Sequence, residues 1–184
     1  MTVQQVYVDG KVINGIDMDI TDQTQRYLLY DAVLTNDSSI VDGKGIGDPT
    51  EYALLEMFRN IQVLPESYLG KIGVHEDALR NVMCRMEEVP FDSDRKLMST
   101  KYYIHGVPTI LTKGAVDVLL DRCVNVRYSD GIRPMTEEEK KKIRLENQKF
   151  SENGLRVLAF AYKESEEVLC VDTECGYTFL GLIS

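Results

Sequence analysis

Residues 96–112 read KLMSTKYYIHGVPTILT and contain the clearest strand pattern in the chain. Within this stretch, residues 96–104 and 107–112 are rich in aromatic and β-branched side chains, and His105-Gly106 separates the two runs. A glycine between two such runs is typical of a tight turn, because glycine accepts backbone angles that other residues avoid. We therefore predict two antiparallel strands joined by a short turn.

Further strands and helices are predicted on both sides of this hairpin. Strand patterns fall at 3–8, 11–13, 86–91, 155–162, 168–171 and 178–183, with Asp9-Gly10 as a two-residue turn. Helical patterns fall at 25–34, 49–61, 76–85, 115–122 and from 137 to a closing Gly154, and the glycine-rich stretch 43–47 is predicted as a loop. Because helices interrupt the hairpins without regular βαβ alternation, the sequence predicts an α+β fold, an antiparallel β-sheet flanked by helices.

Two of the predicted helices begin with capping signals. Asp48 is a good N-cap residue, Pro49 suits the first helical position, and Glu51 follows at the third. Thr136 and Glu139 have the same spacing. We expect each glutamate to reach back to the backbone amide of its cap residue, which would form a capping box.

The composition limits the classes of protein that fit. The 184 residues are 43% hydrophobic and 28% charged, which suits a single domain over 1–184 with a sizeable core. The formal net charge of −9 repels polyanions, so nucleic acid is not expected as a partner. The longest apolar run, 157–162, is far shorter than the roughly 20 residues of a membrane helix. The start of the chain has no secretory signal, and direct membrane contact is not expected.

Four cysteines are few for this length and predict free thiols in a reducing, cytosolic setting. Cys170 and Cys175 have four residues between them and could supply half of a zinc site. The other half would have to come from Cys84, Cys123 or the two histidines, and none of these shows the paired spacing of zinc ligands. A zinc site is therefore not favoured.

Asp17-Met18-Asp19-Ile20-Thr21 matches the Asp-x-Asp-x-Thr nucleophile motif of haloacid-dehalogenase-like phosphatases. That chemistry needs the first carboxylate at the end of a buried apolar strand, whereas a turn and a single apolar residue precede Asp17. A short motif without its structural context is weak, so an ordinary loop is the favoured interpretation. A small phosphohydrolase that uses Asp17 and Asp19 remains the alternative.

Four polar segments are harder to explain by folding alone. They are Gly47-Asp48-Pro49-Thr50-Glu51 at a helix start, 90–99 at a strand junction, Thr112-Lys113-Gly114-Ala115 at a strand end, and Arg156 before an apolar strand. Each has an ordinary structural explanation when taken singly. Together they contain an aromatic face, a carboxylate, a lysine–glycine pair and an arginine, which are the groups that a purine nucleotide needs.

In this order, the segments resemble the nucleotide-binding (N) domain of P-type cation-transporting ATPases, in particular the bacterial members of the calcium-pump branch. The resemblance covers essentially the whole chain and rests on Gly47-Asp48-Pro49-Thr50-Glu51, Phe91-Asp92-Ser93-Asp94-Arg95-Lys96, Lys113-Gly114-Ala115 and Leu155-Arg156-Val157-Leu158-Ala159. Heavy-metal pumps carry a His-Pro signature in this domain, and neither histidine of this chain precedes proline.

The resemblance implies a role for eight residues. Phe91 would stack on adenine, and Glu51 would contact the edge of the base. Lys96, Met98, Lys113 and Gly114 would wall the pocket, while Arg156 would reach toward the phosphates and Leu158 would pack near the sugar. The chain departs from the family at Ser93, where animal calcium pumps commonly carry arginine, and at Val116-Asp117, which replaces Pro-Glu.

The resemblance also implies what the chain leaves to a larger protein. The phosphorylation motif, the Mg²⁺-binding acidic motif and the membrane helices are absent from this sequence, so it resembles an N domain excised from a pump at the cytoplasmic face of a membrane. We expect the isolated chain to bind ATP and ADP without hydrolysing ATP. Only the intact pump would use Mg²⁺ and bring in the phosphorylation and actuator domains as partners of this chain. The alternatives are a free-standing nucleotide-binding regulatory module and an interaction module without a ligand.

Overall fold

A computed structural model of the chain describes residues 1–61, 79–81 and 83–184. The strands are β1 (Gln5–Val8), β2 (Lys11–Asn14), β3 (Ser39–Val41), β4 (Lys44–Ile46), β5 (Glu87–Val89), β6 (Leu97–Ile104), β7 (Val107–Gly114), β8 (Cys123–Tyr128), β9 (Gly131–Pro134), β10 (Leu158–Glu164) and β11 (Tyr177–Ile183). The helices are α1 (Gln23–Leu34), α2 (Pro49–Arg59), α5 (Val116–Leu120) and α6 (Glu137–Glu152), with short 3-10 turns at Gly15–Asp17 and Val171–Thr173.

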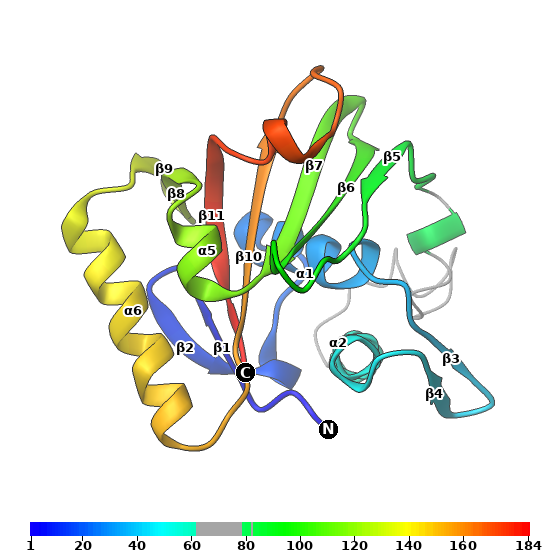
Figure 1. The fold of residues 1–184 in the computed structure, drawn as a ribbon. Helices are drawn as coiled ribbons and strands as arrows, with labels where there is room; N and C mark the ends of the chain where they lie inside the picture. The colour runs from blue at the N-terminus through cyan, green and yellow to red at the C-terminus, as the bar shows by residue number, and fades with distance from the viewer. Residues whose placement is uncertain (62–78, 82) are drawn as a thin grey trace.

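Within the described residues, nine strands form one sheet (Figure 1). Its main path is β2-β1-β11-β10-β7-β6-β5, and β8 and β9 extend it beside β11. All pairs are antiparallel except β8 with β11, which is parallel. The predicted α+β fold with an antiparallel sheet flanked by helices is confirmed, with this one parallel pair as an addition.

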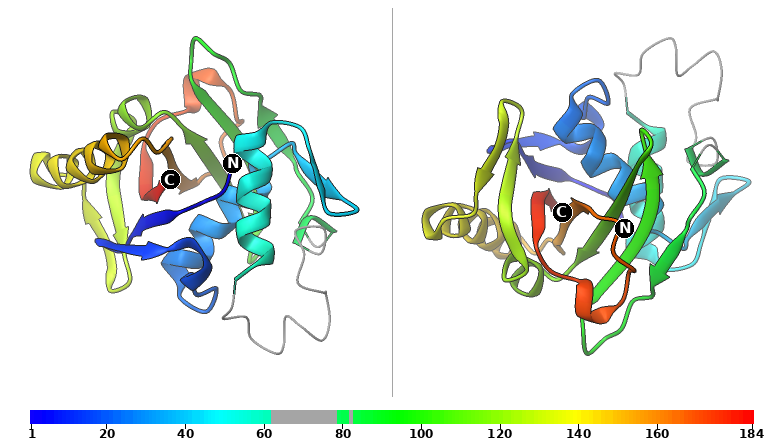
Figure 2. Two further views of the ribbon diagram at one scale, coloured as in Figure 1. Left: turned by 90° about the horizontal axis from the view of Figure 1, so that it is seen from below. Right: turned by 90° about the horizontal axis from the view of Figure 1, so that it is seen from above.

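Helices cover both faces of the sheet, and each face has its own apolar cluster (Figures 1 and 2). Phe160 and Tyr162 of β10 belong to the cluster that contains α1 and α2, while Ala159 and Ala161 belong to the cluster with α5 and α6. Because successive strand side chains point to opposite faces, a strand that is covered on both sides needs a continuous apolar run. This explains the unbroken apolar stretch at 157–162.

Several sequence predictions about local structure are confirmed. The hairpin of β6 and β7 turns at His105-Gly106, and that of β1 and β2 turns at Asp9-Gly10, with all four turn residues at positive φ. Helices occur at the predicted places for α1, α2, α5 and α6, and Gly154 follows α6 at φ +75°. Of the predicted helix 76–85, residues 76–78 and 82 lie outside the described residues, 79–81 is helical, and 83–85 is not helical.

Other predictions about local structure were wrong or incomplete. The predicted loop 43–47 is instead largely strand β4, which pairs with β3 around a turn at Asp42-Gly43. The predicted strand 168–171 is irregular and leads into a 3-10 turn, because side chains such as Glu87 bind its backbone amides in place of a neighbouring strand. Strands β8 and β9 were not predicted.

The two capping signals also differ from expectation. The Asp48 carboxylate accepts from the Thr50 amide at 2.7 Å, but the Glu51 carboxylate turns away from its own helix start and binds elsewhere. Thr136 Oγ1 accepts from the Glu139 amide at 3.2 Å, whereas the Glu139 carboxylate accepts from the Tyr128 hydroxyl. In both helices the N-cap forms, and the reciprocal half of the box is replaced by a tertiary contact.

Candidate functional site

A cavity of about 570 Å³ opens where α2 begins, β7 ends and the loop between β5 and β6 turns. All eight residues singled out from the sequence line it: Glu51, Phe91, Lys96, Met98, Lys113, Gly114, Arg156 and Leu158. They come from four separate parts of the chain. The register of β6 and β7 explains part of this convergence, since Met98 pairs with Lys113 and Leu97 with Gly114 at the open end of the hairpin.

Five further residues line the same cavity: Asp37, Asp48, Thr50, Ala115 and Val157. Four of these belong to the polar segments singled out from the sequence or to the segments on which the family resemblance rests. Asp37 does not, because it follows α1 and reaches the site only through the packing of α1 against α2. No local sequence signal distinguishes it from any other loop aspartate.

A lysine–glutamate pair forms the floor of the cavity. Lys113 Nζ lies 2.6 Å from Glu51 Oε1 and also donates to the Thr35 carbonyl. The Lys113 residue is only 6% exposed, and burial lowers its pKa while the neighbouring Glu51 carboxylate opposes that shift. The other Glu51 oxygen accepts from the Asp37 amide at 3.1 Å and from Ser38 Oγ at 3.2 Å. Both charges are therefore held in fixed positions.

Phe91 stands at the rim, on the loop that joins β5 to β6. It is 60% exposed and lines the cavity, so its ring offers a flat apolar surface to a ligand. The loop is held from within, because the Asp92 carboxylate accepts from the amides of Asp94 and Arg95 at 2.7 and 3.2 Å. These backbone hydrogen bonds lower the pKa of Asp92. Lys96 closes the loop at φ +62°, with its amide 2.6 Å from the Asp92 carbonyl.

Gly114 allows this loop to lie directly against the end of β7. A Cβ atom on Gly114 would fall 2.2 Å from the Lys96 carbonyl oxygen, far inside van der Waals contact. The amide of the next residue, Ala115, donates to the same Lys96 carbonyl at 3.1 Å. A residue without a side chain is therefore required at position 114 for the two walls of the cavity to meet.

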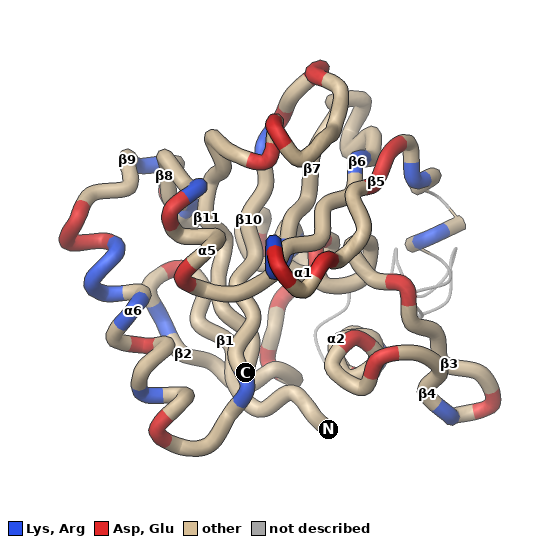
Figure 3. The backbone as a smooth tube through the Cα atoms, viewed as in Figure 1, with Lys and Arg blue, Asp and Glu red and all other residues tan. Residues whose placement is uncertain are grey.

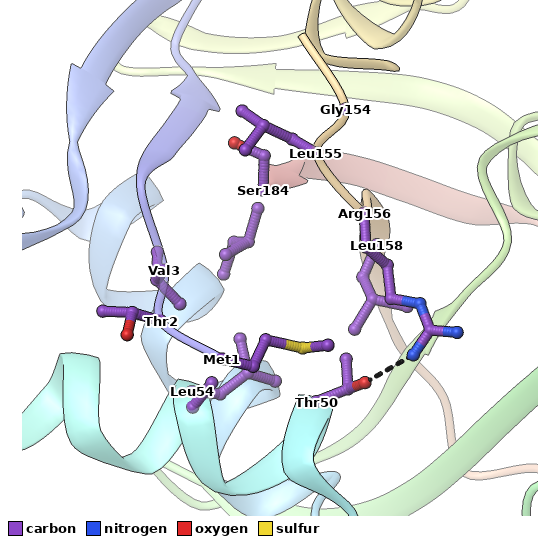
Figure 4. A pocket seen from close by; sticks show the side chains of 12 residues that line it. Met1, Thr2, Val3, Thr50, Leu54, Gly154, Leu155, Arg156, Leu158 and Ser184 are labelled. Carbon is purple, nitrogen blue, oxygen red and sulfur yellow. Dashed lines mark hydrogen bonds between the residues drawn. The ribbon is translucent and has the colours of Figure 1, made fainter.

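Arg156 lies between this cavity and a second one of about 220 Å³. Figure 4 shows its guanidinium extending to Thr50 at the start of α2, with Nη1 2.9 Å from Oγ1. The second cavity is lined largely by apolar groups from the two ends of the chain, including Val3 and Ile183. The two chain ends lie side by side, since the Gln4 amide donates to the Ser184 carbonyl at 2.7 Å.

The charge balance at the cavity differs from that of the whole chain. Acidic and basic residues are spread over many elements (Figure 3), and the chain carries a formal charge of −9. Three acidic and three basic side chains line the larger cavity: Asp37, Asp48 and Glu51, with Lys96, Lys113 and Arg156. Locally, the acidic excess is cancelled, so an anionic ligand meets less repulsion here than the net charge indicates.

A buried carboxyl, Asp31, lies near enough to Lys113 to be influenced by its charge and gives a testable pH dependence. Burial raises its pKa well above the ordinary value, although the Thr35 hydroxyl and the Lys113 charge oppose the shift. The folded protein therefore holds this proton at pH values where the unfolded chain has lost it, and stability falls as pH rises through that range. Asparagine does not titrate, so the Asp31→Asn variant lacks this decrease in stability. Its free energy of unfolding relative to that of wild type should therefore rise as the pH is raised from about 4 to about 7.

Urea denaturation at the two pH values measures the effect of Asp31→Asn. Asp121→Asn is the matched control, because the Asp121 side chain is 71% exposed and should change stability little at either pH. An Asp31→Asn variant whose difference from wild type is the same at pH 4 and pH 7 would contradict the prediction.

Among the residues that the structure describes, the alternative sites considered from the sequence do not assemble. Asp19 Oδ1 accepts from the amide and hydroxyl of Thr21 at 2.9 and 2.6 Å, and Asp17 lies exposed in a 3-10 turn, so the interpretation as an ordinary loop is confirmed. All four cysteines are free thiols, and Cys170 and Cys175 are exposed. Within the described ranges, no group of three or more His, Cys, Asp or Glu side chains is placed to hold a metal ion. His75 lies outside those ranges.

In the part of the chain that the structure describes, no helix is long and apolar enough to cross a membrane.

Comparison with known proteins agrees with this arrangement. The family described as "P-type ATPase, cytoplasmic domain N" matches residues 24–184. The chain is 43% identical over 168 residues to calcium-transporting ATPase 1 of Lactococcus lactis, covering 89% of this chain and 18% of that protein. It is 37% identical over 185 residues to calcium-transporting ATPase 1 of Bacillus cereus, covering 100% of this chain and 20% of that protein. It is 41% identical over 140 residues to a calcium-transporting ATPase of Listeria monocytogenes, covering 76% of this chain and 15% of that protein. The chain thus spans a fifth or less of these relatives, and it belongs to the family of P-type ATPase cytoplasmic N domains.

Proposed function

We propose that residues 1–184 form one domain that binds adenine nucleotides within a calcium-transporting P-type ATPase. The observation that supports this most strongly is the convergence of Phe91, Lys113, Glu51 and Arg156 on one cavity of about 570 Å³. That volume lies inside the range of roughly 300–1,000 Å³ that is usual for small-molecule sites. Among the described residues, the same cavity carries both a flat apolar group and groups of both charges.

The exposed Phe91 ring supplies the stacking surface for the base. Aromatic stacking is tolerant of sequence and base type, because every base presents a flat π-face. Selection of adenine would come from Glu51, whose carboxylate can accept from an exocyclic amino group. Guanine places a carbonyl acceptor where adenine has that amine, and two acceptors repel each other. We expect ATP to bind more tightly than GTP for this reason.

Arg156 and Lys96 would serve the phosphates. Charge-assisted hydrogen bonds from guanidinium and ammonium groups to phosphate oxygens are among the stronger polar contacts in proteins. Arg156 is exposed and already extends across the gap to α2, so it can exchange Thr50 for a phosphate oxygen at little cost. Ser93, which replaces a family arginine, is exposed and does not line the cavity, which leaves that contact to Arg156 and Lys96.

The domain would present the γ-phosphate to a phosphorylation domain in the rest of the pump, at the cytoplasmic face of the membrane. Mg²⁺ there would neutralise charge on the phosphates during transfer. This chain would contribute binding and orientation of the nucleotide. Because its two ends lie side by side, it could swing as a body about a single hinge, with the actuator and phosphorylation domains as partners.

Nucleotide titration tests the proposal. One stacked ring and a few charged contacts, offset by the lost freedom of the ligand, correspond to a Kd of roughly 0.1–1 mM for ATP. In an NMR titration, amide signals around Phe91, Lys113 and Glu51 should shift together in this range. Signals that stay in place up to several millimolar ATP would reject the proposed function.

Phe91→Ala is expected to weaken ATP binding by about tenfold without lowering the melting temperature. The loss corresponds to one base-stacking contact, about 1–3 kcal/mol, and the exposed ring contributes little to the core. Isothermal titration calorimetry measures the binding and differential scanning calorimetry the stability. Tyr103→Ala is the matched control, because Tyr103 is 55% exposed on β6 and does not line the cavity. Equal loss of affinity in both variants would remove Phe91 from the site.

A further inference from the structure

A buried ion pair lies behind the loop that carries Phe91 and Lys96. Arg95 Nε is 2.6 Å from Glu174 Oε1, and the side chains are 11% and 0% exposed. Glu174 lies just before β11, 79 positions further along the chain, so the pair joins the loop to a distant part of the sheet. Neither residue lines the cavity.

Arg95 binds both ends of the loop with the same guanidinium. Its Nη2 donates to the carbonyls of Pro90 at 2.9 Å and Leu97 at 2.6 Å, and more weakly to Val89 at 3.5 Å. Phe91 and Lys96 lie between these attachment points. Because a guanidinium is planar and its N–H groups have fixed directions, the orientation of Arg95 determines how the two ends of the loop sit relative to each other.

Glu174 is held independently of the loop. Its second carboxylate oxygen accepts from Ser99 Oγ at 2.5 Å, and its carbonyl accepts from Arg122 Nη1 at 2.8 Å. Ser99 lies on β6 and also bonds to Thr112 of β7 at 2.7 Å. The carboxylate is thus fixed to the central hairpin and gives Arg95 a rigid reference point.

An ion pair this deeply buried is a poor way to gain stability, because both charges must lose most of their contact with water. What such a pair can provide is a single defined conformation, since an alternative loop position would leave the Glu174 charge buried and unpaired. We propose that Glu174 and Arg95 are positioning residues, which hold Phe91 and Lys96 in the geometry that binds the nucleotide. This inference rests on the proposed function and extends it to residues outside the cavity.

Glu174→Gln tests the inference, because glutamine keeps the shape and the hydrogen bond to Ser99 while removing the charge. In the protein without nucleotide, the backbone order parameters of 90–96 should fall from the rigid value of about 0.85 toward 0.6, while those of the sheet stay unchanged. ATP affinity should fall about fivefold, which is within the range of coupling energies found between residues that share one network of contacts. Asp172→Asn is the matched control, since Asp172 is exposed in the preceding 3-10 turn and loses the same charge.

A thermodynamic cycle separates positioning from a general structural role. If Glu174 acts through the loop, Glu174→Gln should change ATP affinity less than twofold once Phe91 and Lys96 are already alanine. An equal fivefold loss in both backgrounds would overturn the inference, and so would order parameters in the variant that match wild type. Arg95→Lys gives a second route if Glu174→Gln folds poorly, because lysine keeps the charge, but its single nitrogen cannot reproduce the separate guanidinium contacts with Glu174 and with the loop carbonyls.

The two proposals fail in different ways. A wild-type domain that does not bind ATP rejects the proposed function, while the order parameters of the nucleotide-free loop still decide whether the ion pair positions it. A domain that binds ATP with unchanged affinity in Glu174→Gln supports the proposed function and rejects the positioning role.

Discussion

Lys113→Met is expected to lower the free energy of unfolding by about 3–5 kcal/mol, because it leaves the Glu51 carboxylate and the Thr35 carbonyl without their cation. Methionine fills most of the space of the lysine stem, so the loss reports the missing charge more than a cavity. Urea denaturation measures it. The sequence alone predicts Lys113 as a wall residue of a pocket, whereas its burial gives the same residue a part in folding.

The matched control is Lys142→Met on α6. The Lys142 side chain is 64% exposed and lies 3.9 Å from Glu139, and an ion pair whose lysine is this well solvated contributes about 0–1 kcal/mol. The double variant Lys113→Met/Glu51→Gln should recover part of the lost stability, since the remaining side chain is then uncharged. A loss below about 1 kcal/mol for Lys113→Met would show that the pair is solvated and does not form the floor of the cavity.

Much of the fold could be predicted because its signals are local. The hairpin of β6 and β7, the turn at Asp9-Gly10 and the N-cap at Asp48 each depend on residues that are neighbours in sequence. Strands β8 and β9 could not be predicted in this way. β9 is exposed along its length, and β8 is held by a parallel pairing with β11 that lies some 50 residues further along the chain.

The site was predictable in its residue types and not in its contacts. Phe91, Lys113 and Arg156 could be identified because their segments resemble a known family, and they do line one cavity. The sequence misplaced the Glu51 carboxylate in a capping box, because the buried Lys113 offers it a stronger, charge-assisted bond than the Asp48 amide does. The pairing of Arg95 with Glu174 had no sequence signal, since the two residues lie 79 positions apart in unrelated loops.

Gly114 is likewise determined by a tertiary contact, because the neighbouring Lys96 carbonyl leaves no space for a side chain at this position. Gly114→Ala is expected to cost about 3 kcal/mol of stability, near the upper end for an overpacked site, and to weaken ATP binding in the protein that remains folded. The added methyl would meet the Lys96 carbonyl oxygen at 2.2 Å, and backbone that is tied to Ala115 and to Asp92 cannot move aside without shifting the whole loop.

Gly15→Ala is the matched control for this substitution. Its Cβ would also meet a neighbour closely, at 2.9 Å, but that neighbour is the end of the Val3 side chain, which can rotate away. Both glycines have ordinary backbone angles, so the comparison isolates the kind of atom that is approached. Urea denaturation and ATP titration on the two variants should show a large loss of both properties for Gly114→Ala and a small loss of stability alone for Gly15→Ala. Unchanged ATP affinity in Gly114→Ala would mean that the loop carrying Phe91 and Lys96 binds nucleotide without resting on the end of β7.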